Sequence, residues 1–178
     1  NNLIGLPLTV LSTPEDTEVL VLELGMNHAG EITRLTSVAR PTVAVITNVG
    51  TSHIGLLGSR ENIARAKAEI VSGMRAFDSI EPTLIQASAG DYTKFIADEF
   101  ARPARVVCKT VGAIEAGVMS AQQVTLDEEG LPTATIVAAS GWSRTVTLEV
   151  PGRVVVDDLL LALEAIETLG LDLDAAAE

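Results

Sequence analysis

The hydrophobic positions in the first quarter of the chain follow two patterns. The runs at 19–24 and 42–48 are short, rich in Val, Leu and Ile, and do not alternate with polar residues. Strands that are buried on both faces of a parallel sheet have this pattern. Between the runs, apolar residues recur with helical spacing at 32, 35, 38 and 39 before Pro41. The sequence therefore predicts a strand–helix–strand unit with parallel strands.

The middle of the chain continues this alternation. The residues at 83–87 and 105–109 are strand candidates, and 91–100 forms a short helix between them with Asp91 as its N-cap. These elements extend the predicted parallel sheet.

The pattern then becomes β-rich. From Val118 to Val150, apolar strands are separated by turns that contain Gly and Ser, which predicts an antiparallel meander. A long helix follows Pro151-Gly152 and ends at Gly170. We therefore predict an α/β fold: a Rossmann-like, mainly parallel sheet with helices on both faces, plus an antiparallel β extension.

Two polar residues stand at the ends of the predicted buried strands. Glu23 closes the first apolar run, and His53 follows the second. Both would lie at or just past the carboxyl ends of neighbouring strands, where open α/β sheets bind their ligands. A carboxylate at the end of a buried strand is costly unless it is paired or metal-bound, so Glu23 is either a metal ligand or the partner of a neighbouring Arg.

Lys67 interrupts the apolar face of the next predicted helix. That face runs through 63, 66, 70 and 74, and Lys67 lies on it, while Glu61, Arg65 and Glu69 form the opposite, solvated face. Desolvation would lower the pKa of an inward-directed lysine and make its neutral amine available for chemistry. The alternative is a lysine at the edge of the stripe whose ammonium group reaches solvent. We expect Glu23, His53 and Lys67 to face one cavity.

Composition limits the classes of function. The 178 residues are 47% hydrophobic with few aromatics, which fits a single domain over 1–178. The formal charge of -12 argues against binding to nucleic acid or insertion at an anionic membrane, so a phosphate group would be met by local lysines, helix N-termini or a divalent metal. One cysteine excludes an internal disulfide, and no membrane span is present, so a cytoplasmic location is expected.

Four motifs resemble the central ATPase domain of the Mur ligases. They are Asn1-Asn2-x-Ile4-Gly5-x-Pro7-Leu8-Thr9, Glu23-Leu24-Gly25-Met26-Asn27-His28-x-Gly30-Glu31-Ile32, Thr47-Asn48-Val49-Gly50-x-x-His53, and Ser59-Arg60-Glu61-x-Ile63-Ala64-x-Ala66-Lys67-x-Glu69-Ile70. Pro151-Gly152-Arg153 adds a weaker match. The resemblance covers the central domain only, without the Gly-rich phosphate loop or the flanking domains. The chain also begins without Met inside a predicted structured segment, so we expect a partial domain.

The resemblance implies a reaction and its cofactors. In this family ATP phosphorylates a substrate carboxylate to an acyl phosphate, and magnesium stabilises the charge on the phosphoryl group. The most similar branch joins D-alanyl-D-alanine to a UDP-MurNAc-tripeptide. Glu23 and His53 match the family's Mg²⁺ ligands. Lys67 matches a lysine that is often carbamylated and then ligates a second Mg²⁺.

The resemblance also implies binding residues. Asn27 and His28 match residues near the peptide substrate, although a helix cap is an alternative role for Asn27. Asn1 and Asn2 fall where family asparagines approach the phosphates of ATP, and Arg153 belongs to the nucleotide-binding match.

The sequence departs from the family around the adenine. Gln86 to Asp91 replaces an Asn-Ala-Asp-Asp-like turn, Val154-Val155 replaces His-Asn, and Asp158 replaces a later Asn. Two hypotheses therefore stay open: a piece of a catalytic ligase, or a degenerate, non-catalytic binding domain. A folylpolyglutamate synthase is disfavoured by the Asn27-His28-x-Gly30-Glu31 stretch. Without the phosphate loop, this chain by itself is expected to be inactive.

Overall fold

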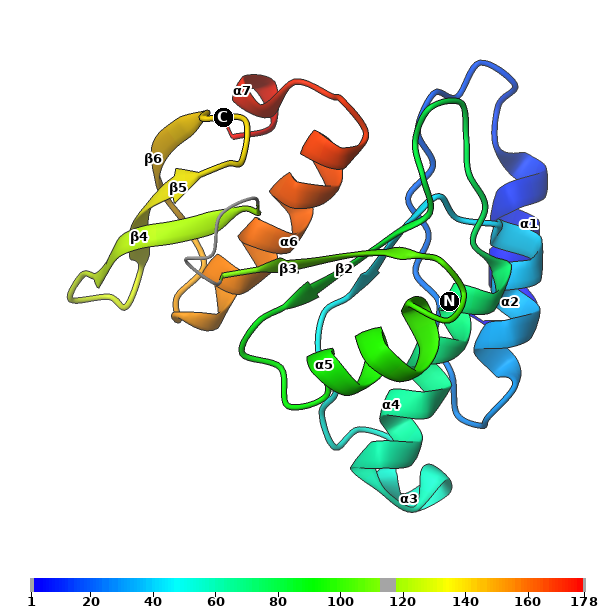
Figure 1. Ribbon diagram of the computed structural model, residues 1–178. Coiled ribbons are helices and arrows are strands. Elements are labelled where there is room, and N and C mark those ends of the chain that lie inside the picture. The colour runs from blue at the N-terminus through cyan, green and yellow to red at the C-terminus, as the bar shows by residue number, and fades with distance from the viewer. Residues whose placement is uncertain (1, 113–117, 178) are drawn as a thin grey trace.

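A parallel sheet forms the centre of the molecule (Figure 1). The computed structural model describes residues 2–112 and 118–177. The sheet contains β1 (Val43–Ile46), β2 (Thr83–Ala87) and β3 (Val107–Val111) in the order β1-β2-β3, and both neighbouring pairs are parallel. The α/β class and the parallel arrangement predicted from the apolar runs are confirmed.

The strand predicted at 19–24 is wrong. This segment is not part of either sheet in the described structure. Val21 is 88% exposed, and Val19 and Leu20 are also exposed, whereas Leu22 and Leu24 pack against a buried helical cluster. A short apolar run indicates burial on both faces only if neighbouring backbone and side chains cover it, and the described chain covers one side of this segment.

Helices cover both faces of the sheet, as predicted (Figure 1). On β2, Ile85 faces a cluster that includes helix α6 (Val154–Thr168). Its neighbour Leu84 faces the opposite cluster, which includes α4 (Arg60–Ala68), α5 (Thr93–Ile96) and the π-helical turn Ala97–Ala101. The alternation follows from the two-residue period of a strand.

A second helical layer packs outside α4. It contains α1 (Gly5–Ser12), α2 (Glu31–Ala39), the four-residue α3 (Ile54–Leu57) and the 3₁₀ turn η1 (Glu69–Gly73). Their shared core consists of Leu6, Met26, Ile32, Leu35, Ile63 and Ala66. No helix in the described part of the chain is both long and apolar enough to cross a membrane.

The antiparallel extension is confirmed. Strands β4 (Ser120–Leu126), β5 (Pro132–Val137) and β6 (Ser143–Thr147) pair in the order β4-β5-β6. The short C-terminal helix α7 (Leu173–Ala176) lies against this meander. It is held there by a hydrogen bond of 2.8 Å from Trp142 Nε1 to Asp174 Oδ1.

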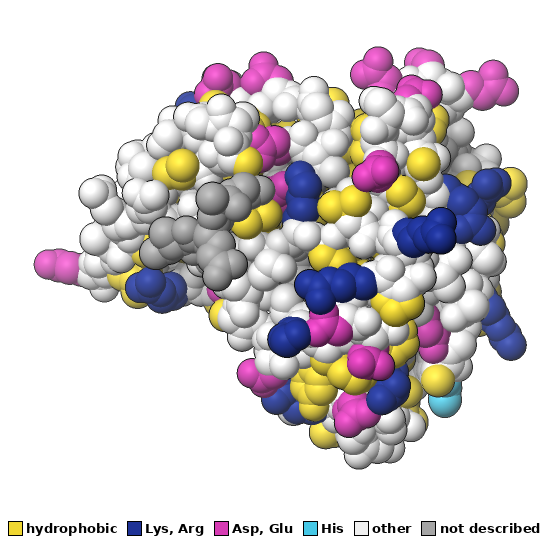
Figure 2. Space-filling model, in the orientation of Figure 1, with side chains coloured by type: hydrophobic (Ala, Val, Ile, Leu, Met, Phe, Trp, Pro, Cys, Tyr) yellow, Lys and Arg dark blue, Asp and Glu magenta, His cyan; other side chains and the backbone are white. Residues whose placement is uncertain are grey.

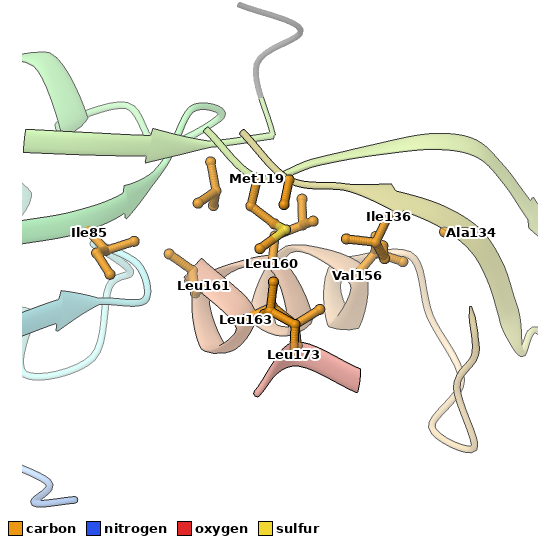
Figure 3. Packing of buried hydrophobic residues seen from close by; sticks show 11 residues of the cluster. Ile85, Met119, Ala134, Ile136, Val156, Leu160, Leu161, Leu163 and Leu173 are labelled. Carbon is orange, nitrogen blue, oxygen red and sulfur yellow. The ribbon is translucent and has the colours of Figure 1, made fainter. Parts of the chain in front are cut away.

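Helix α6 joins the two sheets. Figure 3 shows Met119, Leu160 and Leu163 between Ile85 of the parallel sheet and Ile136 of the meander. All five side chains are at most 1% exposed. The same helix therefore supplies the core for both sheets and fixes their relative position.

A buried ion pair reinforces this junction. Glu164 on α6 is 1% exposed and accepts hydrogen bonds from Lys109 Nζ of β3 at 2.7 Å and from the backbone N–H of Met119 at 2.9 Å. Lys109 Nζ also donates to Thr168 Oγ1 at 3.0 Å. The carboxylate thereby connects α6, β3 and the segment that begins β4.

We expect Glu164→Gln to lower the free energy of unfolding by about 3 kcal/mol, because removing one partner of a buried ion pair leaves the other charge uncompensated. The measurement is the urea midpoint of the chain, with Asp158→Asn as the control because Asp158 is an exposed acid on the same helix. The double variant Glu164→Leu/Lys109→Met should recover much of the loss, since it removes both charges together. Equal midpoints for Glu164→Gln and the control would contradict the prediction.

Gly73 makes the closest backbone approach between η1 and α2. A Cβ atom at this position would lie 2.4 Å from Thr36 Oγ1 and 2.5 Å from the Thr36 carbonyl oxygen. We expect Gly73→Ala to destabilise the chain by about 1–3 kcal/mol through overpacking, measured as a fall in thermal midpoint. Gly55→Ala is the matched control, because a Cβ there meets nothing within 4 Å. An unchanged thermal midpoint for Gly73→Ala would contradict the prediction, because it would mean that α2 and η1 move apart at little cost in free energy.

Candidate active site

The loop after β1 is held by the two ends of helix α4. Lys67 Nζ, in the last turn, donates to the carbonyl oxygen of Asn48 at 2.7 Å. Arg60, in the first turn, donates to the next carbonyl, that of Val49, at 2.8 Å. Two cationic side chains of α4 therefore donate hydrogen bonds to consecutive backbone carbonyl groups. These carbonyl groups follow β1 at the carboxyl edge of the sheet, where α/β folds bind ligands.

Lys67 is directed inward, as the sequence predicted. Its side chain is half-buried, and desolvation lowers the pKa of its amine below the ordinary lysine value. The hydrogen bond to the Asn48 carbonyl favours the charged form, but the desolvation effect is larger. The amine is therefore more available in its neutral, nucleophilic form than that of an exposed lysine.

His53 has an unusual backbone conformation. Its φ is 66°, in the left-handed region, and it immediately precedes α3 as the N-cap residue. The side chain is exposed. Non-glycine residues in this region are uncommon, although His tolerates it better than branched residues, and such positions concentrate at functional sites.

The neighbours of Glu23 in the sequence pack against helix α4. Leu22 and Leu24 pack in the cluster that contains Ala66 of α4, and Val49 packs against this cluster as well. The segments that carry Glu23, Lys67 and the loop to His53 thus converge on one core. In the described ranges no three His, Cys, Asp or Glu side chains form a metal-binding group. The three-residue site remains a prediction.

A cavity of about 400 Å³ opens between the start of α2, α3 and α4, and Glu23, His53 and Lys67 are not among its lining residues. His28 lines it together with Arg65 and Glu69, and the remaining lining residues are Ala29, Leu56, Leu57, Asn62 and Ala66. Arg65 forms an ion pair with Glu61 at 2.8 Å. Glu69, expected on the solvated face, instead accepts hydrogen bonds from the N–H groups of Gly30 at 2.7 Å and Thr33 at 3.1 Å.

Asn27 and His28 are held by the first turn of α2. Their backbone N–H groups donate to Glu31 Oε2 at 2.6 and 3.2 Å, and these bonds lower the pKa of Glu31. The alternative role of Asn27 as a helix cap is ruled out, because Gly30 occupies the N-cap position of α2. Both side chains are exposed and so accessible to a ligand.

The predicted nucleotide-binding residues are spread over two places. Asn1 lies outside the described residues. Asn2 Oδ1 accepts from the N–H groups of Ile4 at 3.0 Å and Gly5 at 2.8 Å, so it caps the start of α1. Arg153 lines a second cavity, of about 300 Å³, at the carboxyl end of β3.

Sequence reasoning missed a link between the loops after β1 and β2. Arg60 pairs with Asp91 at 2.7 Å, and its guanidinium lies 5.4 Å from the centre of the Tyr92 ring. Asp91, predicted as a helix cap, is used for this pair, and Tyr92 holds the N-cap position of α5. The sequence shows Arg60 only as a residue that follows the helix cap Ser59. Sequence spacing does not reveal its contact with Asp91, because the two residues belong to separate loops.

Basic and acidic side chains are mixed on the face that Figure 2 shows. Lys and Arg lie over its middle with Asp and Glu between them, and further Asp and Glu lie along the upper rim. Several of these cations are paired, as in Arg60–Asp91 and Arg65–Glu61.

A parallel sheet with helices on both faces, and with polar side chains gathered at its carboxyl edge, defines an α/β ligand-binding domain. The family model described as "Mur ligase middle domain" matches residues 1–166. The chain therefore belongs to the Mur ligase family, which confirms the resemblance found in the sequence motifs.

Individual relatives agree with this assignment. UDP-N-acetylmuramoyl-tripeptide--D-alanyl-D-alanine ligase of Bacillus subtilis (strain 168) is 60% identical over 75 residues, which are 42% of this chain and 16% of that protein. A crystal structure of MurF from Acinetobacter baumannii matches with a TM-score of 0.88 and 29% identity, over 99% of this chain and 37% of that chain. MurF ligase from Thermotoga maritima in complex with ADP has a TM-score of 0.74 and 27% identity, over 98% and 39%. The chain thus spans less than two fifths of the length of these relatives.

We expect the amine of Lys67 to titrate at a lower pH in the folded chain than in the urea-unfolded chain, because burial disfavours its charged form. The chain has three lysines, so reductive methylation with ¹³C-formaldehyde gives few signals to follow by NMR against pH, and Lys67→Arg assigns its signal. Since the folded state binds this proton less tightly, the contribution of Lys67 to stability should rise as the pH rises toward the unfolded value. Equal titration midpoints in the folded and unfolded chain would contradict a desolvated amine.

Proposed function

We propose that this chain forms the nucleotide- and magnesium-binding part of an ATP-dependent amide ligase that adds D-alanyl-D-alanine to a UDP-MurNAc-tripeptide. Its membership of the Mur ligase family and the names of its relatives support the substrates, and the ADP complex of the Thermotoga maritima relative supports the nucleotide. The observation that carries the proposal for this chain is the half-buried Lys67 at the carboxyl edge of the sheet. A cytoplasmic location follows from these soluble substrates.

The residues at this edge fit Mg²⁺ through their chemistry. Glu23 supplies a carboxylate and His53 an imidazole, although Mg²⁺ prefers oxygen ligands and retains several waters. The neutral amine of Lys67 attacks carbon dioxide, a C–N bond forms, and a proton leaves to solvent, so that the amine becomes a carbamate with two oxygens. The carbamate would add the oxygen ligands that the other two residues lack. Bound magnesium supplies charge stabilisation at the phosphoryl group that is transferred.

The cavity at the start of α2 is our candidate for the peptide substrate. Asn27 and His28 are exposed beside it, and Arg65 gives it a cation that can meet a carboxylate. Apolar walls from Leu56 and Leu57 suit the aliphatic parts of a peptide. Asn27, His28 and Arg65 would thereby orient the substrate carboxylate that ATP phosphorylates.

We assign nucleotide binding to the carboxyl edge of the sheet, where Arg153 lies at the cavity beside the end of β3. Asn2, the second residue that the family resemblance assigns to the nucleotide, holds the start of α1. A nucleotide with its phosphates near Lys67 would reach across the loops after β1 and β2, which Arg60 connects through Val49 and Asp91. Arg60 would then hold the loop after β1 and the loop after β2 at a fixed distance from each other.

A non-catalytic binding domain is the second candidate. The observation that favours it is Gln86, which stands where the family has an Asn near the adenine. Gln86 is 2% exposed, and its amide donates to the Thr93 carbonyl at 3.4 Å. A buried and engaged amide is a poor contact for a base, and this supports a domain that does not hold the adenine through this position.

A chimera separates the two candidates. We expect a protein in which this chain replaces the matching segment of Acinetobacter baumannii MurF to release ADP only when UDP-MurNAc-tripeptide and D-alanyl-D-alanine are both present. Lys67→Met should lower kcat by about 100-fold or more, the loss typical for one charge-stabilising group in an active site. Glu23→Gln and His53→Ala should raise the Mg²⁺ concentration needed for half-maximal rate.

The control is Glu15→Gln, a change of an exposed acid remote from the sheet edge. A folded chimera that binds ADP but does not ligate would favour the non-catalytic domain. Unchanged kcat in Lys67→Met would remove Lys67 from the mechanism.

A further inference from the structure

Glu69 connects helix α4 to the first turn of α2 at the cavity that we assign to the peptide substrate. It directly follows the last residue of α4, and its half-buried side chain lines this cavity. Glu69 Oε1 accepts a hydrogen bond from the N–H of Gly30 at 2.7 Å. Glu69 Oε2 accepts from the N–H of Thr33 at 3.1 Å and from the Thr33 hydroxyl at 3.2 Å. Both carboxylate oxygens are therefore occupied by groups at the start of α2.

The N-cap residue of α2 cannot cap the helix through a side chain, because it is Gly30. The first N–H groups of a helix need acceptors from outside the helix, and the helix dipole favours an anion at that end. Glu69 supplies this acceptor from 39 residues away in the sequence. In addition, Glu31 of the first turn accepts from the N–H groups of Asn27 and His28. Two carboxylates thus fix the backbone that leads into α2.

Other contacts already hold the later turns of α2 against its neighbours. Leu35 packs with Ile63 of α4 in a buried core, and Thr36 Oγ1 donates to the Ile70 carbonyl at 3.0 Å. These contacts lie more than one turn away from the start of α2. The bonds of Glu69 act instead on the first turn, which borders the cavity.

We propose that Glu69 is a positioning residue for the peptide substrate: its carboxylate holds the start of α2 where His28 and Arg65 line one cavity. The inference rests on the proposed function, which assigns this cavity to the UDP-MurNAc-tripeptide. His28 reaches the cavity from the segment before α2, and Arg65 reaches it from α4. A ligand that contacts both side chains loses affinity when the two elements shift, because small misplacements of positioning groups are costly. Glu69 acts through the backbone of α2, since its own oxygens are occupied.

Calorimetric titration of the Acinetobacter baumannii MurF chimera with UDP-MurNAc-tripeptide and with ADP tests this role. Glu69→Gln keeps one acceptor oxygen, so it can bond to only one of its two N–H partners, and Glu69→Ala keeps none. We expect the Kd of the tripeptide to rise about tenfold in Glu69→Gln and further in Glu69→Ala, a loss typical for a hydrogen bond to a charged group. The Kd of ADP should stay the same. Glu81→Gln is the matched control and should change neither Kd, because Glu81 is an exposed acid before β2, at the amino edge of the sheet.

Amide hydrogen exchange in the chain itself tests how Glu69 acts. The N–H groups of Gly30 and Thr33 should exchange at least about tenfold faster in Glu69→Ala, because they lose their acceptor. The N–H of Arg40, which donates to the Thr36 carbonyl at 2.8 Å at the other end of α2, should keep its rate. This pattern separates a shift of the first turn from a loss of the whole helix.

An unchanged tripeptide Kd in Glu69→Ala, or an equal loss of affinity for ADP and tripeptide, would overturn the inference. Unchanged exchange at Gly30 and Thr33, equal acceleration at Arg40, or a chimera that binds no tripeptide would overturn it as well. A chimera that ligates with a tripeptide KM independent of Glu69 would leave the proposed function intact. An inactive chimera whose tripeptide affinity depends on Glu69 would contradict the ligase function alone.

Discussion

The buried carboxylate of Glu164 is the interaction on which the arrangement of the two sheets depends. It compensates Lys109 of β3 and the Met119 N–H at the start of β4, so one side chain of α6 satisfies groups from both sheets. An acid that is 1% exposed is costly unless each oxygen has a partner, and here Oε1 and Oε2 each have one. Apolar packing around Leu160 alone would allow the meander to slide on α6, whereas directed bonds fix its position.

That fixed position determines the geometry of the carboxyl edge. The cavity with Asp157 exists because β4 is held against the first turns of α6 near the end of β3. At the other end of the edge, Lys67 and Arg60 hold the loop after β1 from opposite ends of α4. Arg60 Nε is buried and has no hydrogen-bond partner among the residues that the structure describes, a cost that the bonds of the same guanidinium to Val49 and Asp91 offset.

The spacing of hydrophobic residues correctly predicted the strands and helices whose hydrophobic side chains pack into a buried core. The strand at 83–87 and the helix that begins at Glu31 form as expected, because β2 is covered on both faces and α2 buries a regular stripe. The strand at 19–24 failed because the same apolar pattern is covered on one side only. Glu164 and Glu69 could not be predicted, since their partners lie 45 and 39 residues away in the sequence and no local spacing encodes such contacts.

The candidate site shows the same division. The inward direction of Lys67 followed from its place on an apolar stripe, and its contact with the Asn48 carbonyl accords with that prediction. The half-buried position of Asp157 in a cavity wall did not follow, because an acid in the first turn of a helix is ordinarily an exposed, favourable partner of the helix dipole. Its significance arises from tertiary structure, where Gly112 and the meander convert that first turn into the wall of a cavity. The position of Asp157 in that wall could not be predicted from local spacing, because it depends on contacts between α6, β3 and β4.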